Sequence, residues 1–383
     1  MTQLDPQAKV VLLLHGGTAN LSGKTGLAML RYRKGPIVAV VDPEYAGENL
    51  RAITGIDRAV PIVASVAAAL AHGPQVAVVG LAPSGGRLPP VVHADVAAAL
   101  GAGLSVASGL HTRLGDDPAL AALVQGGAWI WDLRREPLDL VVASGRAAAL
   151  PGRRLLAVGS DMAVGKMSAC LELQAAALGR GLDARFVGTG QAGILISGAG
   201  VALDAVRVDY AAGAVEQAVL AAAAGGDASS WVLVEGQGSL CHPGSTATLP
   251  LLRGSQPTDL LLVHRAGQAH IRGLADVPLP PLPQLIGAVE ALAALARPAT
   301  ALAPAPKVRA IALNTALLEP AAAEAAIAEV EKATGLPCAD AVREGAGGAD
   351  RLLNAFLQER HKKTPSEPKG LEEERGQRAS EGT

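Results

Sequence analysis

The chain has 383 residues and a formal charge of −2, from 33 Lys and Arg against 35 Asp and Glu. It therefore offers no broad basic surface for nucleic acid. Half of the residues are hydrophobic, yet only 2% are aromatic and 45 are glycine, a bias that is typical of Rossmann-like layers. The length suits two such domains.

The cysteines and the N-terminal residues indicate in which cellular compartment the protein is expected. Cys170, Cys241 and Cys338 lie far apart without C-x-x-C spacing, which argues against a disulfide framework or a zinc cluster. The first ten residues lack the layout of a signal peptide, and no stretch of about 18 uncharged apolar residues predicts a membrane span. We expect a cytoplasmic homo-oligomer that acts on a small molecule, with no nucleic acid or membrane partner.

The first half alternates short β-type runs with helical stretches, which indicates βαβ units and a mostly parallel sheet. The predicted strands are Val10–Leu14, Ile37–Val41, Val76–Val79, Leu104–Ala107 and Ala128–Asp132. Helical patterning covers Leu27–Tyr32, Ser65–Ala71, Val91–Leu100 and Pro118–Gln125.

A second series follows an aperiodic stretch at Ala143–Arg154, where we place the domain boundary. Its predicted strands are Leu155–Val158, Ala184–Val187, Ala205–Val208, Trp231–Val234, Leu260–His264 and Val308–Leu313. The expected class is α/β, with a Rossmann-like domain at 1–148 and a P-loop NTPase-like, three-layer domain at 149–360, both with mostly parallel sheets. The charged tail 361–383 should be disordered.

The strongest motif is a phosphate-binding loop. In LLAVGSDMAVGKMSACLEL, residues 155–173, a predicted strand leads into a loop bounded by Gly159 and Gly165, and Lys166 opens a helix. Backbone N–H groups in such a loop surround a phosphate, and the lysine neutralises it. The spacing, with Asp161 inside the loop, resembles dethiobiotin synthetase. A structural turn is the alternative.

The loop departs from the usual pattern where magnesium binds. Met167 stands at the position of the Ser or Thr that normally holds the ion, and a thioether cannot coordinate a hard cation. Unless Ser168 or Asp161 takes that role, we expect a bound phosphate whose bond is never broken, such as the 3′-phospho-ADP end of coenzyme A. No metal site is predicted.

Polar residues follow the next two predicted strands. Thr189 and Gln191 stand at the carboxyl edge where open α/β sheets bind ligands, so we expect them to line the substrate; a glycine-rich turn is the alternative. Asp209 is a candidate base or a helix N-cap, and Glu216 would share its helical face.

A second motif, Glu235-Gly-Gln237-Gly, follows the strand Trp231–Val234. An acid at this place in P-loop proteins holds the metal or its water, and dethiobiotin synthetase has a similar turn. We expect Glu235 to be functional, and we expect Gln237 to lie beside the phosphate loop and to contact the substrate. His242 is a candidate acid or base at neutral pH, or a structural hydrogen-bonder. Cys241 has no evident partner that would lower its pKa.

Further candidates follow other strands. The amide of Asn314 could face a nucleotide base, or the residue could form a turn. In the first half, the segment 17–25 has the pattern of a stretched P-loop, and Asp42 then contacts a ribose or caps a loop; we favour a non-hydrolysing pocket. Arg87 and His111 could hold a substrate carboxylate or stabilise loops.

Several motifs together resemble the DgcN-like family, long known only as a domain of unknown function, over about residues 8–358. They are GLAPSGGRLPP, SGLHTRLGDDP, VGSDMAVGKMSACLEL, FVGTGQAGILISG, DAVRVDYAAGAVE and VEGQGSLCHPG. The resemblance implies a Rossmann-like domain joined to a P-loop domain. It also implies N-acetylation of D-glutamate from acetyl-CoA, in a D-glutamate breakdown route with an enolase-superfamily partner enzyme.

An acetyltransferase must hold the phosphates of acetyl-CoA without cleaving them, which agrees with the missing magnesium hydroxyl. Glu235, Asp209 and His242 are candidates for the base that deprotonates the amine. Gln191 and the backbone of Gly236–Gly238 are candidates for stabilising the oxyanion. The second hypothesis is a ligase or kinase that uses ATP and magnesium on a small carboxylate. The third is a nucleotide-binding regulatory module.

Overall fold

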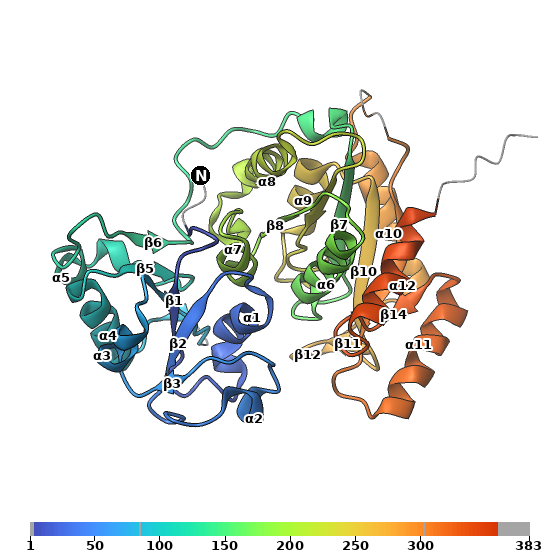
Figure 1. Ribbon diagram of the computed structural model, residues 1–383. Coiled ribbons are helices and arrows are strands. Elements are labelled where there is room, and N and C mark those ends of the chain that lie inside the picture. Colours follow the sequence, from blue (N-terminus) through green and yellow to red (C-terminus); the bar gives the residue numbers. More distant parts are fainter. Residues whose placement is uncertain (1–3, 84–85, 300, 302, 359–383) are drawn as a thin grey trace, which may run out of the picture.

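Two parallel β-sheets organise the chain, one in each half (Figure 1). The computed structural model describes residues 4–83, 86–299, 301 and 303–358. The predicted tail 361–383 lies outside the described residues. The expected α/β class with mostly parallel sheets is confirmed, since each six-stranded sheet has only parallel pairs.

The N-terminal sheet has the strand order β3-β2-β1-β4-β5-β6, so the order reverses between β1 and β4. Its strands are β1 (Val10–Leu13), β2 (Ile37–Val41), β3 (Ile62–Val63), β4 (Val76–Val79), β5 (Ser105–Ser108) and β6 (Ile130–Asp132). Its helices are α1 (Lys24–Tyr32), α2 (Leu50–Thr54), α3 (Val66–Ala69), α4 (Pro90–Gly101) and α5 (Pro118–Ala121). Successive residues of β1 enter buried clusters on opposite faces of the sheet, which gives three layers.

The C-terminal sheet has the order β14-β13-β10-β7-β9-β8. Its strands are β7 (Arg153–Gly159), β8 (Ala184–Val187), β9 (Trp231–Val234), β10 (Asp259–Arg265), β13 (Lys307–Asn314) and β14 (Cys338–Ala339), and a hairpin of β11 (His270–Ile271) and β12 (Leu274–Pro278) follows β10. The helices are α6 (Lys166–Gly179), α7 (Gln191–Ser197), α8 (Val208–Ala223), α9 (Thr248–Ser255), α10 (Leu282–Leu295), α11 (Pro320–Thr334) and α12 (Ala346–Leu357).

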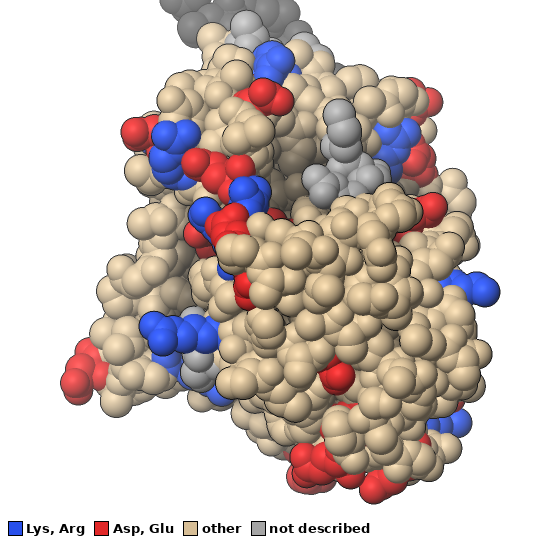
Figure 2. Space-filling view, turned by 90° about the vertical axis from the view of Figure 1, so that its left-hand side faces the viewer, with Lys and Arg blue, Asp and Glu red and all other residues tan. Residues whose placement is uncertain are grey.

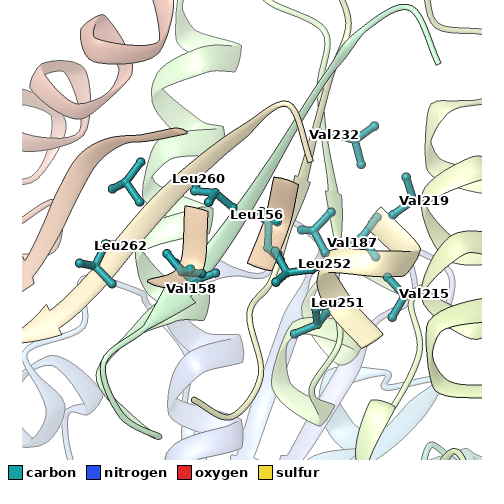
Figure 3. Packing of buried hydrophobic residues seen from close by; sticks show 14 of the residues in the cluster. Leu156, Val158, Val187, Val215, Val219, Val232, Leu251, Leu252, Leu260 and Leu262 are labelled. Atoms are coloured by element: carbon teal, nitrogen blue, oxygen red, sulfur yellow. The ribbon is translucent and has the colours of Figure 1, made fainter. Parts of the chain in front are cut away.

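Alternating residues of β7 build the two faces of this sheet. Leu156 and Val158 pack under α8, α9 and α10 (Figure 3), while Leu155 and Ala157 pack under α6 and α12. The expected three-layer arrangement follows from this alternation, because side chains along a strand point to opposite faces in turn.

The predicted strand Ala205–Val208 is wrong. A 3₁₀ helix occupies Leu203–Ala205, and α8 begins at Val208. Val206 packs against the core of the C-terminal sheet, whereas Ala205 packs against the core of the N-terminal sheet. The apolar run therefore bridges two cores, and four residues are too few for periodicity to distinguish this from a strand.

Helix α7 joins the two halves. Its Ile194 and Leu195 belong to the same buried cluster as Met29 and Leu30 of α1, and Figure 1 shows the two helices side by side. The Arg33 guanidinium donates to the Leu195 carbonyl oxygen at 3.4 Å. One buried cluster of the N-terminal half is therefore completed by side chains from a helix of the C-terminal half.

Figure 2 shows a broad area with few charged residues on this side of the molecule, with Lys and Arg and with Asp and Glu side chains toward its margins. Among the described residues, no helix is long and apolar enough to cross a membrane.

A buried carboxylate fixes the connector between the sheets, residues 133–152. Glu216 of α8 is fully buried. It accepts hydrogen bonds from the backbone N–H groups of Ser144 at 3.2 Å and Arg146 at 2.7 Å, and from Arg146 Nε at 3.3 Å. Glu216 therefore holds the connector against α8. The predicted boundary after residue 148 lies within this connector and stays a prediction.

Replacing Glu216 by Ala should lower the free energy of unfolding by about 1–3 kcal/mol, because the backbone N–H groups of Ser144 and Arg146 lose their hydrogen bonds to a charged acceptor. Denaturant titration followed by tryptophan fluorescence measures the change. Glu324→Ala, at an exposed position of α11, is the matched control and should cost less than about 0.5 kcal/mol. Equal effects of the two substitutions would show that the carboxylate does not hold the connector.

Candidate phosphate-binding and catalytic site

Glycines shape the loop between β7 and α6. Gly165 has a φ of +112°, a left-handed conformation that favours glycine. A Cβ at Gly159 would lie 2.8 Å from Lys166 Nζ, and one at Gly236 would lie 2.8 Å from Lys166 Cδ. The missing side chains therefore make room for the lysine. Because the first turn of α6 also presents N–H groups without helical partners, the loop suits an anion.

Lys166 is buried at the start of α6. Only 6% of the residue is exposed, and its Nζ donates to the Asp161 carbonyl oxygen at 2.8 Å. Burial lowers the pKa of Lys166 to about 8, while the nearby charges of Glu235 and Asp161 act in the opposite direction. At pH 7 the side chain remains mostly protonated, so it supplies a positive charge to the loop.

Glu235 follows β9 and lies next to this lysine. Its Oε2 accepts hydrogen bonds from the backbone N–H groups of Thr189 at 2.9 Å and Gly190 at 3.1 Å. Burial raises the pKa of Glu235 to about 7, and these two hydrogen bonds and Lys166 oppose the shift. A carboxyl with this pKa can exchange a proton near neutral pH, as a general base must.

Thr189 and Gln237, which the sequence predicts to contact substrate, form hydrogen bonds that hold Glu235 in place. The Thr189 hydroxyl donates to the Glu235 carbonyl oxygen at 2.8 Å, and Gln237 Nε2 donates to the Thr189 carbonyl oxygen at 3.2 Å. Gly193 leaves space for the carboxylate, since a Cβ there would collide with it. The loops after β8 and β9 therefore form one hydrogen-bonded unit.

Asp161 ties the phosphate loop to the β11–β12 hairpin. Its Oδ1 accepts from the Met162 N–H at 2.7 Å. Its Oδ2 accepts from Gln268 Nε2 at 2.6 Å and from the Arg272 N–H at 2.7 Å. Both carboxylate oxygens are thus engaged within the protein, so Asp161 positions the loop.

Ser168, the other candidate for a magnesium ligand, faces the N-terminal half. It hydrogen bonds to the Tyr32 hydroxyl, which also donates to Glu172 Oε1 at 3.0 Å. Burial raises the pKa of Tyr32 to about 12, so the hydroxyl stays protonated. In the part of the chain that the structure describes, no group of three or more His, Cys, Asp or Glu is placed to hold a metal ion.

Ser160 and His264 form a pair that the sequence reasoning did not single out. Ser160 Oγ and His264 Nδ1 are 2.8 Å apart, at the carboxyl ends of neighbouring strands β7 and β10. Burial lowers the pKa of His264 to about 4, so the imidazole is neutral at pH 7. A signal was present, since His264 is a polar residue at the end of a predicted apolar strand.

Asn314 closes the other end of the phosphate loop. Its Nδ2 donates to the Val164 carbonyl oxygen at 3.0 Å, and its Oδ1 accepts from the Ala316 N–H at 3.1 Å. The predicted strand-end position is confirmed by β13, which ends at this residue. In this arrangement the amide holds the loop and forms a turn.

Asp209 and His242 are not brought into contact with Lys166 or Glu235 by any hydrogen bond among the described residues. Asp209 is exposed in the first turn of α8, where Arg207 is the N-cap, so the predicted N-cap role is wrong. His242 Nδ1 accepts from the Gly244 N–H at 3.0 Å, as expected of a structural hydrogen-bonder. Burial raises the pKa of Cys241, which disfavours its thiolate.

Gln191 brings the carboxyl ends of the two sheets together. Its Nε2 donates to Thr25 Oγ1 at 3.0 Å, and its Oε1 accepts from Arg134 at 2.8 Å. Arg134 also donates to the Gly109 carbonyl oxygen, which follows β5, and forms an ion pair of 2.9 Å with Asp204. The side chain predicted to contact substrate is thus a bridge between domains.

The N-terminal candidates lie along the loops after β1, β2, β4 and β5. Asp42 is buried and accepts from the Gly16 N–H at 2.8 Å and the Thr18 hydroxyl at 2.6 Å, so of the two expected roles it caps the loop. The His111 N–H donates to the Gly86 carbonyl oxygen at 2.9 Å, and the neighbouring Arg87 is exposed. Their contact with a substrate carboxylate stays a prediction.

Family models match both halves of the chain. The P-loop domain described as DUF1611, a domain of unknown function, matches residues 141–353, and the Rossmann-like N-terminal domain of the same family matches residues 43–136. The chain belongs to the DUF1611 family. The resemblance inferred from the motifs is therefore confirmed, as are the Rossmann-like and P-loop domains.

Relatives of known structure or with curated names support this assignment. A crystal structure of a DUF1611 family protein from Anabaena variabilis ATCC 29413 is 54% identical, covers 92% of this chain and 100% of its own, and has a TM-score of 0.84. A protein from Tritonibacter scottomollicae named D-glutamate N-acetyltransferase is 39% identical, over 75% of this chain and 83% of its own. One from Pseudoalteromonas with the same name is 34% identical, over 73% and 82%.

The Glu235 carboxyl should titrate with a midpoint of about pH 7. Carbon NMR of protein labelled in the glutamate carboxyl groups measures this midpoint, and Glu235→Gln identifies the resonance by removing it. A midpoint near the ordinary glutamate value of about 4.3 would contradict the burial that the structure gives to this group.

Proposed function

We propose that this protein transfers the acetyl group of acetyl-CoA to the amine of D-glutamate, in D-amino-acid catabolism. The observation that carries the proposal is the buried Lys166 of a glycine-built phosphate loop, with the buried carboxyl group of Glu235 near it after β9. It places a cation for a phosphate next to a carboxyl group that can accept a proton at neutral pH. The names of the two curated relatives point to the same activity.

The residues of the loop fit a phosphate group that is held and not cleaved. Lys166 and the N-terminus of α6 supply positive charge, and the glycines keep the cradle open. Met167 stands in place of the magnesium-binding hydroxyl, while Asp161 and Ser168 are engaged in hydrogen bonds within the protein. These features support acetyl-CoA over a nucleotide whose phosphate is transferred.

Glu235 is the base that we assign to the reaction. It accepts the proton that the amine loses as nitrogen attacks the thioester carbonyl carbon. The C–N bond forms, the C–S bond breaks, and the coenzyme thiolate leaves and is protonated by water. Because Glu235 accepts a proton only when ionised, its role requires a pH near or above its pKa of about 7. Asp209 and His242 stay lesser candidates.

The oxyanion of this reaction needs hydrogen-bond donors. Both functional groups of the Gln191 amide are engaged with Thr25 and Arg134, so we assign this role to the backbone of Gly236–Gly238. The cytoplasmic location and the homo-oligomer expected from the sequence stay predictions.

Purified protein given acetyl-CoA and D-glutamate without ATP should release free thiol, and L-glutamate should give little, because the proposed activity acts on the D-isomer. A thiol-reactive dye follows the release. No release with either isomer, combined with ADP formation from ATP, magnesium and a small carboxylate, would instead establish the ligase or kinase hypothesis. Tight nucleotide binding without turnover would establish the regulatory one.

Lys166→Ala should raise the KM for acetyl-CoA by about 10–100-fold, since it removes a charge-assisted contact to phosphate. In the wild type, the KM should also rise above about pH 8 as the ammonium loses its proton, whereas the variant should not show this rise. Steady-state kinetics between pH 6.5 and 9 measure both effects.

The matched control for this experiment is Lys24→Ala, in the P-loop-like segment of the N-terminal half. Lys24 is exposed, so its removal should leave the KM for acetyl-CoA and its pH dependence unchanged. Equal kinetics of the Lys166 variant and the wild type would remove the phosphate loop from the mechanism.

A further inference from the structure

A pocket of about 290 Å³ opens at the beginning of the phosphate loop. Its polar lining consists of Ser160, His264 and Gln268. The remaining wall is apolar and comes from the segment around the β11–β12 hairpin and the start of α10, namely Ala269, Leu279, Pro280, Pro281 and Leu282. The volume is at the lower end of ligand pockets, about 300–1,000 Å³, so it suits one arm of a larger ligand.

The lining selects an uncharged group. None of the lining residues is Lys, Arg, Asp or Glu, and His264 is neutral at pH 7 because burial lowers its pKa. A phosphate or a dicarboxylate would be desolvated here without an opposite charge, which is costly. The pocket therefore does not suit D-glutamate or the phosphates of a nucleotide.

Gln268 leaves one hydrogen-bonding group unused. Its Nε2 donates to Asp161 Oδ2 at 2.6 Å and to the His270 carbonyl oxygen at 3.0 Å. Its Oε1 is buried and has no hydrogen-bond partner among the described residues. A buried acceptor without a partner is unfavourable. A small movement of the Gln268 side chain that turns Oε1 toward the pocket would let an N–H donor of a ligand satisfy it.

The phosphate loop lies between this pocket and Asn314. Ser160, at the first position after β7, lines the pocket, whereas Asn314 contacts Val164 near the end of the loop. A ligand with its phosphates in the loop would thus have one end toward Asn314 and the other toward the pocket.

We infer that the pocket receives the pantetheine arm of acetyl-CoA, an inference that rests on the proposed function. This arm is uncharged, its two amide groups carry N–H donors that Gln268 Oε1 can accept from, and its methyl groups match the apolar wall. The phosphates of the same molecule occupy the adjacent loop.

A substitution that fills the pocket should weaken binding of the pantetheine arm without changing binding of the phosphate-bearing part of the coenzyme. Ala269→Trp places a large side chain at an exposed lining position and should weaken acetyl-CoA binding at least about tenfold, because it occupies the volume of the arm. Binding of adenosine 3′,5′-bisphosphate, which has no pantetheine, should be unchanged. Isothermal titration calorimetry measures both dissociation constants.

Two further variants serve as controls for this test. Ala275→Trp, at an exposed position of β12 outside the pocket lining, should leave both constants unchanged. Ala269→Leu, a smaller obstruction, should weaken acetyl-CoA binding less than Ala269→Trp, which guards against misfolding as the cause.

The outcomes distinguish this inference from the proposed function. If acetyl-CoA binds equally well to the wild type and to Ala269→Trp, the pocket does not hold the arm, yet the acetyltransferase proposal stands. An equal loss for both ligands in Ala269→Trp would also overturn the pocket assignment. If the wild type binds neither ligand and releases no thiol from acetyl-CoA, both proposals fail.

Discussion

The electrostatic interaction between the buried groups Lys166 and Glu235 is the one on which the C-terminal site depends. Removing two charges from water is costly, and their mutual attraction offsets this only when further hydrogen bonds stabilise each of them. Here the N–H groups of Thr189 and Gly190 stabilise the carboxylate, and the Asp161 carbonyl oxygen stabilises the ammonium. An anion that enters the loop would favour the protonated lysine and so stabilise its own site.

This arrangement requires the backbone to approach the Lys166 and Glu235 side chains closely, which favours glycine at the contact positions. Side chains at Gly159, Gly193 or Gly236 would collide with Lys166 or Glu235. The same device recurs where α8 meets the connector, since a Cβ at Gly213 would collide with the Val141 carbonyl oxygen. Part of the high glycine content of the chain, 45 residues in all, therefore follows from the close packing of these loops and layers.

The features that the sequence predicts correctly are those with strong local causes. Uninterrupted apolar runs bounded by polar or turn-forming residues predict buried parallel strands, and the runs Ile37–Val41, Val76–Val79 and Trp231–Val234 match β2, β4 and β9 residue for residue. The phosphate loop is equally local, because strand, glycines and lysine are contiguous. Two-residue strands such as β3 and β14 leave no periodicity to detect.

What could not be predicted depends on contacts between distant segments. The pairing of Ser160 with His264 joins residues 104 positions apart, and Asp161 meets the hairpin through Gln268, 107 positions away. Sequence reasoning likewise treats Thr189 and Gln191 as free to bind substrate. Their hydrogen-bond partners come from the loop after β9 and from the other domain, and neither strand order nor domain packing can be read from spacing alone.

The hydrogen bonds of Gln191 couple the position of the N-terminal half to Glu235. Its side chain contacts Thr25 and Arg134 in the N-terminal half, while the N–H of the preceding residue, Gly190, donates to Glu235. A displacement of the N-terminal half would therefore act on a group that stabilises the ionised carboxyl. Loss of that hydrogen bond would raise the pKa of Glu235 further, so the packing of α7 against α1 helps to keep the proposed base ionised.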